Sequence, residues 1–352
     1  MARNDVGRRP SSDREAVFAT ARDWLGDGER VVWATVVGTW SSSPRPLGSQ
    51  MVVAEGGRFA GSVSGGCVES AVLVAAGEVF AGGPARTLKY GVSTEQAWEV
   101  GLPCGGTIEV HLGEAQRPIV ERLVEARARR QSVTRVIELA SGAEALWDAG
   151  GPSAFSSGEE ALASAVEQAH HREQSQLVDL SGRRFFVHVV AAPLRLIVVG
   201  AVHLTQTLAE LATLSGIDVT VVDPRTAFAT PERFPGVALS HEWPDVALER
   251  LGLDRRSAVV VLSHDAKLDE PALEAALKSE CFYIGALGSQ RTQAARRGRL
   301  GEAGFGEEAL RRIHGPVGLD IGALTTPEIA ISIMAELIRA WRRRSEPMEA
   351  AR

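Results

Sequence analysis

The stretch Leu196-Ile197-Val198-Val199-Gly200 decides how the second half of this chain folds. A short apolar run rich in β-branched residues, ended by glycine and followed at once by a helical pattern, is typical of a buried parallel strand. Twenty-three residues after Gly200, Asp223 ends the next apolar strand. A carboxylate at this position typically accepts hydrogen bonds from a ribose 2′-hydroxyl. The spacing therefore indicates a sheet of the nucleotide-binding type.

Strand and helix patterns alternate from Leu194 to the end of the chain. Strands are expected over 195–199, 218–222, 258–262 and 282–284. Helices are expected over 204–214, 271–278, 290–300 and 327–342. Such alternation is the signature of a parallel sheet covered by helices. Residues 193–352 are therefore predicted to form a Rossmann-like, doubly wound parallel sheet, and the chain is placed in the α/β class.

The glycine fingerprint of this fold is incomplete. The pattern G-x-G-x-x-G would need glycine at Val202 and glycine or alanine at Thr205, so only Gly200 is kept. The second glycine normally lets the backbone approach a pyrophosphate, and a valine side chain obstructs that approach. The sequence predicts the fold and leaves open whether its crevice holds a nucleotide.

Polar groups follow the expected strands at their carboxyl ends, where a doubly wound sheet places its ligands. A glycine-serine pair before the helix at 290 offers free N–H groups to an anion, with an arginine beside it. The candidate ligand-binding residues of this edge are Gly200, His203, Asp223, His264, Gly288, Ser289 and Arg291.

At 352 residues the chain exceeds what one core usually supports, so two domains are expected. The first, 1–140, is interpreted as α+β. Its helices are expected over 12–25, 68–80 and 118–130, and its strands over 30–39, 51–54, 59–63, 86–90 and 107–112. Between residues 141 and 172 the composition shifts to Ala, Ser, Gly and Glu with weak periodicity, which is compatible with one helix. Residues 141–192 are interpreted as a connector with one closing strand, 184–190.

Two of the three cysteines lie in glycine-flanked turns of the first domain. Cys67 follows Ser64-Gly65-Gly66 at an expected helix start, where backbone N–H groups and the helix dipole favour anions and thiolates. Cys104 is flanked by Gly101 and Gly105-Gly106, which leave a thiol accessible. The pair is compatible with a soft ligand site, a sulfur-handling site or a redox couple. Cys281 precedes an apolar strand and is interpreted as a core residue.

The bulk composition excludes several classes. A net charge of −6 argues against a general nucleic-acid binder. Three cysteines in a chain of this length do not form a disulfide framework, so reduced thiols are expected. The N-terminus lacks the apolar segment of a signal peptide, and no stretch approaches the ~20 apolar residues of a membrane span. The sequence predicts a soluble, cytoplasmic protein.

Several motifs resemble those of the XdhC/CoxI family. The run 61–69, Gly-Ser-Val-Ser-Gly-Gly-Cys-Val-Glu, resembles its G-S-[VI]-S-G-G-C-[VL]-E motif. The segments 43–48 and 101–106 resemble its S-x-P-R-x-x-G loop and its G-L-x-C-G-G segment. In the second half, 263–265, 283–289, 315–322 and 326–330 also match its pattern. One departure is Val202, because family members commonly read G-A-G-H at that turn.

The resemblance implies an N-terminal XdhC/CoxI domain, a C-terminal Rossmann domain and a role in maturing molybdenum hydroxylases such as xanthine dehydrogenase and aerobic CO dehydrogenase. The two domains together would bind molybdenum cofactor and assist its sulfuration and insertion. A cysteine desulfurase would supply the sulfur and an apo-hydroxylase would receive the product. Family members are often dimers, so a homodimer is implied as well.

Molybdopterin carries a phosphate, a dithiolene and an oxidised metal, so its site should offer N–H groups, arginine and thiolate. The residues of those types are Arg45, Ser64, Gly65, Gly66, Cys67 and Cys104. On this reading Cys67 contacts molybdenum, Cys104 supports it and Arg45 meets the phosphate. No residue is assigned to catalysis, because the resemblance implies a cofactor chaperone rather than a turnover enzyme.

Two other functions stay open at this stage. The first is an NAD(P)-dependent oxidoreductase with Asp223 on the ribose and His264 as acid or base. The second is a sulfurtransferase that carries a persulfide on Cys67. No histidine lies near either N-terminal cysteine in sequence to serve as a base, so the chaperone reading is preferred.

Overall fold

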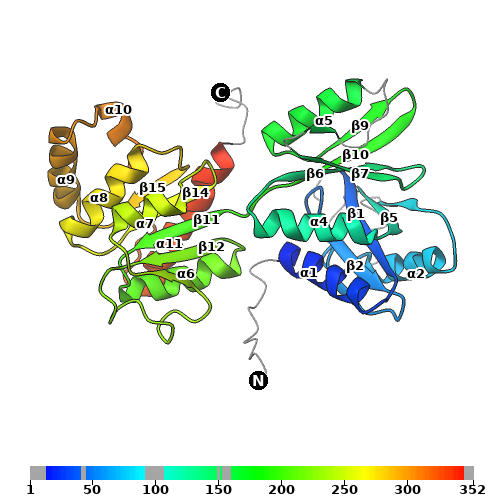
Figure 1. Ribbon diagram of the computed structural model, residues 1–352, viewed down its shortest axis with the longest axis horizontal. Helices are drawn as coiled ribbons and strands as arrows, with labels where there is room; N and C mark the ends of the chain where they lie inside the picture. Colours follow the sequence, from blue (N-terminus) through cyan, green and yellow to red (C-terminus); the bar gives the residue numbers. More distant parts are fainter. Residues whose placement is uncertain (1–12, 41–44, 92–106, 149–150, 153–159, 345–352) are drawn as a thin grey trace. The chain divides into compact units, whose positions relative to one another are not determined.

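The computed structural model describes residues 13–40, 45–91, 107–148, 151–152 and 160–344 (Figure 1). These residues form two compact units, one over Asp13–Ala192 and one from Pro193 onward. Each unit has its own sheets and its own buried apolar clusters. In the described part of the chain, none of the helices is both long and apolar enough to span a bilayer.

The first unit contains an antiparallel sheet built from β1 (Val31–Trp40), β2 (Gln50–Ala54), β3 (Phe59–Gly61), β4 (Arg86–Gly91) and β5 (Thr107–Glu114). The strand order is β3-β2-β1-β5-β4. Alternate residues of β1 pack into two different apolar clusters, as the two-residue period of a strand requires. One cluster includes α2 (Glu69–Phe80), and the other includes α1 (Asp13–Gly26) and α4 (Arg117–Ala128).

The range expected to be a connector holds most of a second sheet. This sheet consists of β6 (Val133–Glu138), β7 (Glu144–Asp148), β8 (Gly151–Pro152), β9 (Gln176–Leu180) and β10 (Arg183–Val190), with α5 (Glu160–Arg172) packed on it. The strand order is β8-β7-β6-β10-β9, and its pairs are antiparallel. The weak periodicity has a physical reason, because β7 and β9 are short and only partly buried.

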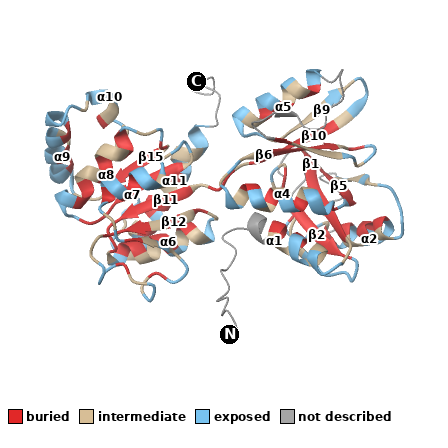
Figure 2. Cartoon of the chain, in the orientation of Figure 1, coloured by how far each residue is buried: buried red, intermediate tan, exposed pale blue. Residues whose placement is uncertain are grey.

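The second unit is a six-stranded sheet whose neighbouring strands pair in parallel. Its strands are β11 (Arg195–Val199), β12 (Asp218–Val222), β13 (Ala238–Ser240), β14 (Ser257–Val261), β15 (Tyr283–Ala286) and β16 (Ile313–His314). They are ordered β13-β12-β11-β14-β15-β16, so the order reverses beside β11, as in a doubly wound fold. Figure 2 shows that burial concentrates on these strands.

Helices cover both faces of the parallel sheet. One face packs on α6 (His203–Leu214) and α11 (Thr326–Arg343). The other face packs on α7 (Pro244–Leu251), α8 (Ala266–Leu277), α9 (Gln290–Glu302) and α10 (Glu307–Leu310). The predicted fold class, an α+β region followed by a Rossmann-like doubly wound sheet, is confirmed.

Most element boundaries in the second unit lie within a residue or two of those expected from the sequence. The helix expected over 271–278 is an exception, because α8 begins at Ala266 and contains Pro271. Asp265 caps this helix by accepting a hydrogen bond from the Lys267 N–H, so the proline does not mark the start. Helices α7 and α10 and strands β13 and β16 were not expected.

Candidate functional site

Cys67 lies on the loop that joins β3 to α2. Its thiol is free and the residue is exposed. The two residues before it, Gly65 and Gly66, have φ values of +82° and +124°, which L side chains rarely adopt. No atom lies within 4 Å of a Cβ built on either residue. The glycines are therefore required by backbone conformation rather than by space.

The side chain of Glu69 occupies the concave side of this loop. Its Oε1 accepts hydrogen bonds from the Ser62 hydroxyl (2.7 Å) and from the N–H groups of Ser64 (2.9 Å) and Gly65 (3.1 Å). Its Oε2 accepts from the Gly66 N–H (2.9 Å) and from the Ser64 hydroxyl. Burial opposes ionisation of this carboxyl, but the hydrogen bonds from Ser64 and Ser62 outweigh it and lower the pKa of Glu69 to about 2.

This arrangement changes the interpretation of Ser64, Gly65 and Gly66. The sequence indicated that their N–H groups would favour an anionic ligand. In the structure those groups donate to Glu69, which is itself the anion of the loop. Sequence reasoning missed Glu69, although its position two residues after Cys67, at the start of α2, was a usable signal.

The register of the first sheet brings together, at one end of the sheet, the strand ends that adjoin the motif segments. Met51 at the start of β2 pairs with Gly61 at the end of β3, and Thr107 at the start of β5 pairs with Trp40 at the end of β1. The loops before β2, after β3 and before β5 therefore leave the sheet at the same end. Arg45 lies on the first of these and is partly buried. Cys104 belongs to the third and lies outside the described residues.

The turn after β11 is closed by the chain's own side chains. Gly200 has a φ of +104°, and a Cβ there would lie 2.7 Å from the Ser263 nitrogen, so this close approach requires glycine. Asp223 is fully buried and accepts hydrogen bonds from the N–H groups of Ala201 (2.8 Å) and Arg225 (2.9 Å). The Arg225 guanidinium donates two more, at 2.9 and 2.7 Å.

Burial raises the pKa of the Asp223 carboxyl, but the hydrogen bonds from Arg225 and the Ala201 N–H outweigh that effect and hold it below its ordinary value. A carboxylate has about four lone-pair sites, and these four donors fill them. Asp223 is therefore satisfied within the chain, unlike a carboxylate that waits for a ribose hydroxyl.

Further contacts around the turn after β11 hold it in place. Val202 is the N-cap residue of α6 and is partly buried, and the exposed His203 lies with its Nδ1 3.3 Å from Gln206 Oε1. The Arg233 guanidinium donates to the Ala201 carbonyl at 2.9 Å. Arg225 stacks on the ring of Phe228, with 4.3 Å from its Cζ to the ring centroid. The missing second glycine therefore coincides with a turn held by arginines.

A buried ion pair that sequence reasoning also missed joins α8 to α9 beside the loop after β14. Asp269 accepts hydrogen bonds from the Ser263 hydroxyl (2.6 Å) and pairs with Arg296 (3.3 Å), and both charged side chains are buried. Burial raises the pKa of Asp269, with Ser263 and Arg296 acting in the opposite direction. His264 lies between Ser263 and the capping Asp265, is exposed and has a φ of +61°.

The remaining candidates lie after β15. Ser289 is the N-cap residue of α9, and its hydroxyl accepts a hydrogen bond from the Thr292 N–H at 3.3 Å. Gly288 has a φ of +133°, and Arg291 is exposed. Because the strands are parallel, the turns at Gly200, Asp223, His264 and Ser289 all lie at the carboxyl edge of the sheet. The expected grouping of these residues at one edge is thus present.

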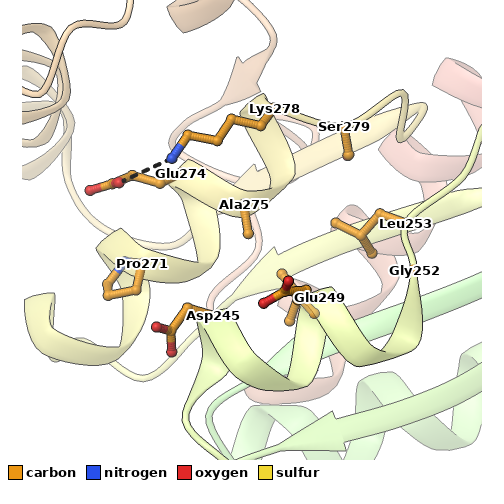
Figure 3. Close-up of a pocket in the computed structure, with 10 residues that line it drawn as sticks. Asp245, Glu249, Gly252, Leu253, Pro271, Glu274, Ala275, Lys278 and Ser279 are labelled. Atoms are coloured by element: carbon orange, nitrogen blue, oxygen red, sulfur yellow. Dashed lines mark ion pairs between the residues drawn. The ribbon is translucent and has the colours of Figure 1, made fainter.

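A groove elsewhere on the second unit does not belong to this edge. It lies between α7 and α8 and has a volume of about 600 Å³ (Figure 3). Apolar residues and three carboxylates line it, and one of the carboxylates, Glu274, forms an ion pair with Lys278 (3.8 Å). None of the candidate residues that the structure describes lines the groove. Within the described ranges, no three or more His, Cys, Asp or Glu side chains gather as a metal site would require.

Comparison with known proteins places the chain in a family. Residues 24–91 match the model of the XdhC and CoxI family, and residues 196–337 match the model of the XdhC Rossmann domain. The chain is 30% identical to the molybdenum cofactor insertion chaperone PaoD of Escherichia coli over 93% of its own length and 88% of the relative's. It is 29% identical to a probable xanthine dehydrogenase subunit of Bacillus subtilis, over 91% and 96% of the two chains.

A solved structure agrees with these matches. The crystal structure of a xanthine dehydrogenase from Bacillus halodurans superposes with a TM-score of 0.76 at 28% identity. The superposition covers 97% of this chain and 98% of that one. The motif segments, the Rossmann sheet and a full-length relative thus agree, and the chain belongs to the XdhC and CoxI family.

Proposed function

We propose that this protein is a maturation factor that binds molybdenum cofactor and assists its sulfuration and insertion into a molybdenum hydroxylase of the xanthine dehydrogenase or CO dehydrogenase type. The observation that carries the proposal is the similarity, over nearly the whole chain, to a relative named a molybdenum cofactor insertion chaperone. The exposed free thiol of Cys67, on a loop with fixed geometry, supports it.

In this proposal the cofactor is cargo, and the chain's side chains divide its recognition. The Cys67 thiol suits a soft contact with molybdenum, with Cys104 in support. The N–H groups of Ser64, Gly65 and Gly66 already donate to Glu69. The phosphate of the cofactor would therefore be bound by a cationic side chain, for which Arg45 is the candidate. Candidates for further contacts are the residues of the Rossmann edge, among which His264 and Arg291 are exposed.

The proposed partners follow from the same cargo. An apo-hydroxylase would receive the cofactor, and a cysteine desulfurase would supply the sulfur that the mature cofactor carries. We also propose that the protein acts in the cytoplasm and forms a homodimer, as the family resemblance implies.

A persulfide carrier is the second candidate, because an exposed cysteine on a fixed loop also suits sulfur transfer. It predicts that Cys67 gains the mass of one sulfur atom after incubation with a cysteine desulfurase. An NAD(P)-dependent oxidoreductase has less support. The Asp223 carboxylate would have to bind the ribose, but it already accepts hydrogen bonds from Arg225 and from the Ala201 N–H.

The test is equilibrium binding of molybdenum cofactor to anaerobically purified protein. Wild type is compared with Cys67→Ala and with Cys281→Ala, a matched cysteine variant in the buried core of the other unit. We expect saturable binding by wild type and Cys281→Ala, and weak binding by Cys67→Ala. Absence of binding by wild type refutes the proposed function, and full affinity of Cys67→Ala refutes the role of that cysteine.

A further inference from the structure

The loop that carries Cys67 is irregular and exposed, yet one buried side chain fixes its backbone. Gly65, Gly66 and Cys67 are exposed, whereas Glu69 is only 9% exposed. The N–H groups of Val63 and Val68 also donate to the Glu69 carboxylate, at 3.2 and 3.3 Å. Backbone donors on both sides of Cys67 therefore converge on the same carboxylate.

These contacts are of the strong kind. Hydrogen bonds to an ionised acceptor are roughly twice as strong as neutral ones, and a carboxylate at the first turn of a helix also gains from the helix dipole. A buried carboxylate is tolerated only when its oxygens are satisfied, and here the Ser62 and Ser64 hydroxyls complete the set. The loop is held in this form by the protein alone, with no ligand needed.

We propose that Glu69 is a positioning residue, whose buried carboxylate fixes the Ser64–Val68 loop so that the Cys67 thiol is presented to molybdenum cofactor in one geometry. This inference rests on the proposed function. Glu69 does not touch the cofactor in this scheme. Its effect is preorganisation, because a loop that is already ordered loses less conformational entropy when the cargo binds.

The same contacts argue against a phosphate site on this loop. An anion placed there would have to displace Glu69 from the N–H groups of Ser64, Gly65 and Gly66. Removal of the carboxylate should therefore create a small anion site that the wild-type protein lacks. Formate, which carries the same carboxylate, is the probe that fits.

The experiment combines amide hydrogen exchange with cofactor binding in the full-length protein. The variants are Glu69→Gln, which turns one acceptor oxygen into an N–H donor facing the loop's own N–H groups, and Glu69→Ala with and without formate. The matched control is Glu78→Gln, which removes the same charge from the other end of α2, where Glu78 pairs with Arg86 on the surface. Unchanged amide exchange in β1 and α4, which belong to the same unit as Glu69, shows that each variant remains folded.

In Glu69→Gln we expect the Gly65 and Gly66 amides to exchange about ten-fold faster or more. We also expect the dissociation constant for molybdenum cofactor to rise about ten-fold, with no change in Glu78→Gln. Formate should restore both protection and affinity in Glu69→Ala, which a general loss of stability would not show.

Wild-type exchange rates in Glu69→Gln overturn the proposal, because the carboxylate then does not fix the loop. Wild-type affinity together with faster exchange overturns it as well, because the fixed loop then does not serve binding. If wild type itself binds no cofactor, the proposed function fails, and the amide exchange still decides separately whether Glu69 holds the loop.

Discussion

His111 provides a quantitative test of the first unit, because a polar row crosses its sheet inside the core. Thr35 on β1 pairs with Gln50 on β2 and with His111 on β5, which in turn pairs with Thr87 on β4. His111 is 2% exposed, and its Nδ1 lies 3.1 Å from the Thr87 hydroxyl. Burial, with a smaller contribution from the positive charge of Arg135, lowers the pKa of His111 from 6.5 to about 4.

The sign of the resulting pH dependence follows from proton binding. Below pH 6.5 the unfolded chain binds a proton at His111 that the folded chain does not bind until the pH approaches about 4. The free energy of unfolding therefore decreases as the pH falls through this window. A shift from 6.5 to about 4 corresponds to about 3 kcal/mol in total, at about 1.4 kcal/mol per unit, of which about 2 kcal/mol is lost between about pH 7.5 and about pH 5.

The assay compares wild type with His111→Asn, whose neutral amide keeps a hydrogen-bonding group near Thr87. The free energy of unfolding of the first unit is measured from amide exchange of β1 and β5, because His111 lies in that sheet. We expect the difference between wild type and His111→Asn to change by about 2 kcal/mol across the window, in the sense that wild type loses more stability in acid. A difference independent of pH would refute the reasoning, because His111 would then not be a buried neutral base.

Three other changes test the site in the same way. Gly200→Ala should destabilise the second unit by about 1–3 kcal/mol in urea unfolding, because φ is +104° and the new Cβ would lie 2.7 Å from the Ser263 nitrogen; an unchanged midpoint would contradict this. Arg296→Met should lower the free energy of unfolding by about 3–5 kcal/mol, because Asp269 is then buried without its cation. The double variant Arg296→Met/Asp269→Leu should regain most of that stability in the same assay. The advantage of wild type over Glu69→Gln in thermal unfolding should shrink as the pH falls from 4.5 toward about 2, and a constant difference would show that Glu69 does not titrate there.

The parallel sheet was predictable from the sequence because its strands are buried on both faces. The runs at 195–199 and 218–222 are rich in Leu, Ile and Val, and they form β11 and β12 with the expected bounds. The same reasoning fails for β7 and β9, which are short and partly exposed, so their apolar residues do not alternate clearly. Strand pairing with β6 and β10, rather than the local pattern, selects their conformation.

The candidate sites were predictable as positions but not as contacts. The register and the parallel strands place the expected turns together, as the order of the elements requires. Which group satisfies each turn could not be read in advance, because Glu69 folds back on its own loop and Arg225 turns toward a carboxylate two residues away. In sequence both resemble ordinary surface charges.

In both units, a carboxylate of the chain itself accepts hydrogen bonds from the N–H groups of a glycine-rich turn. In the first, Glu69 takes the N–H groups before Cys67; in the second, Asp223 takes the Ala201 N–H after β11. A glycine-rich turn before a helix binds a ligand anion only when its N–H groups are free. At these two turns the chain supplies its own carboxylate, whereas the Gly288–Ser289 turn is capped by the Ser289 hydroxyl. In the proposed function, cationic side chains and the Cys67 thiol are therefore the candidates for contacting the cofactor, rather than the N–H groups of these two turns.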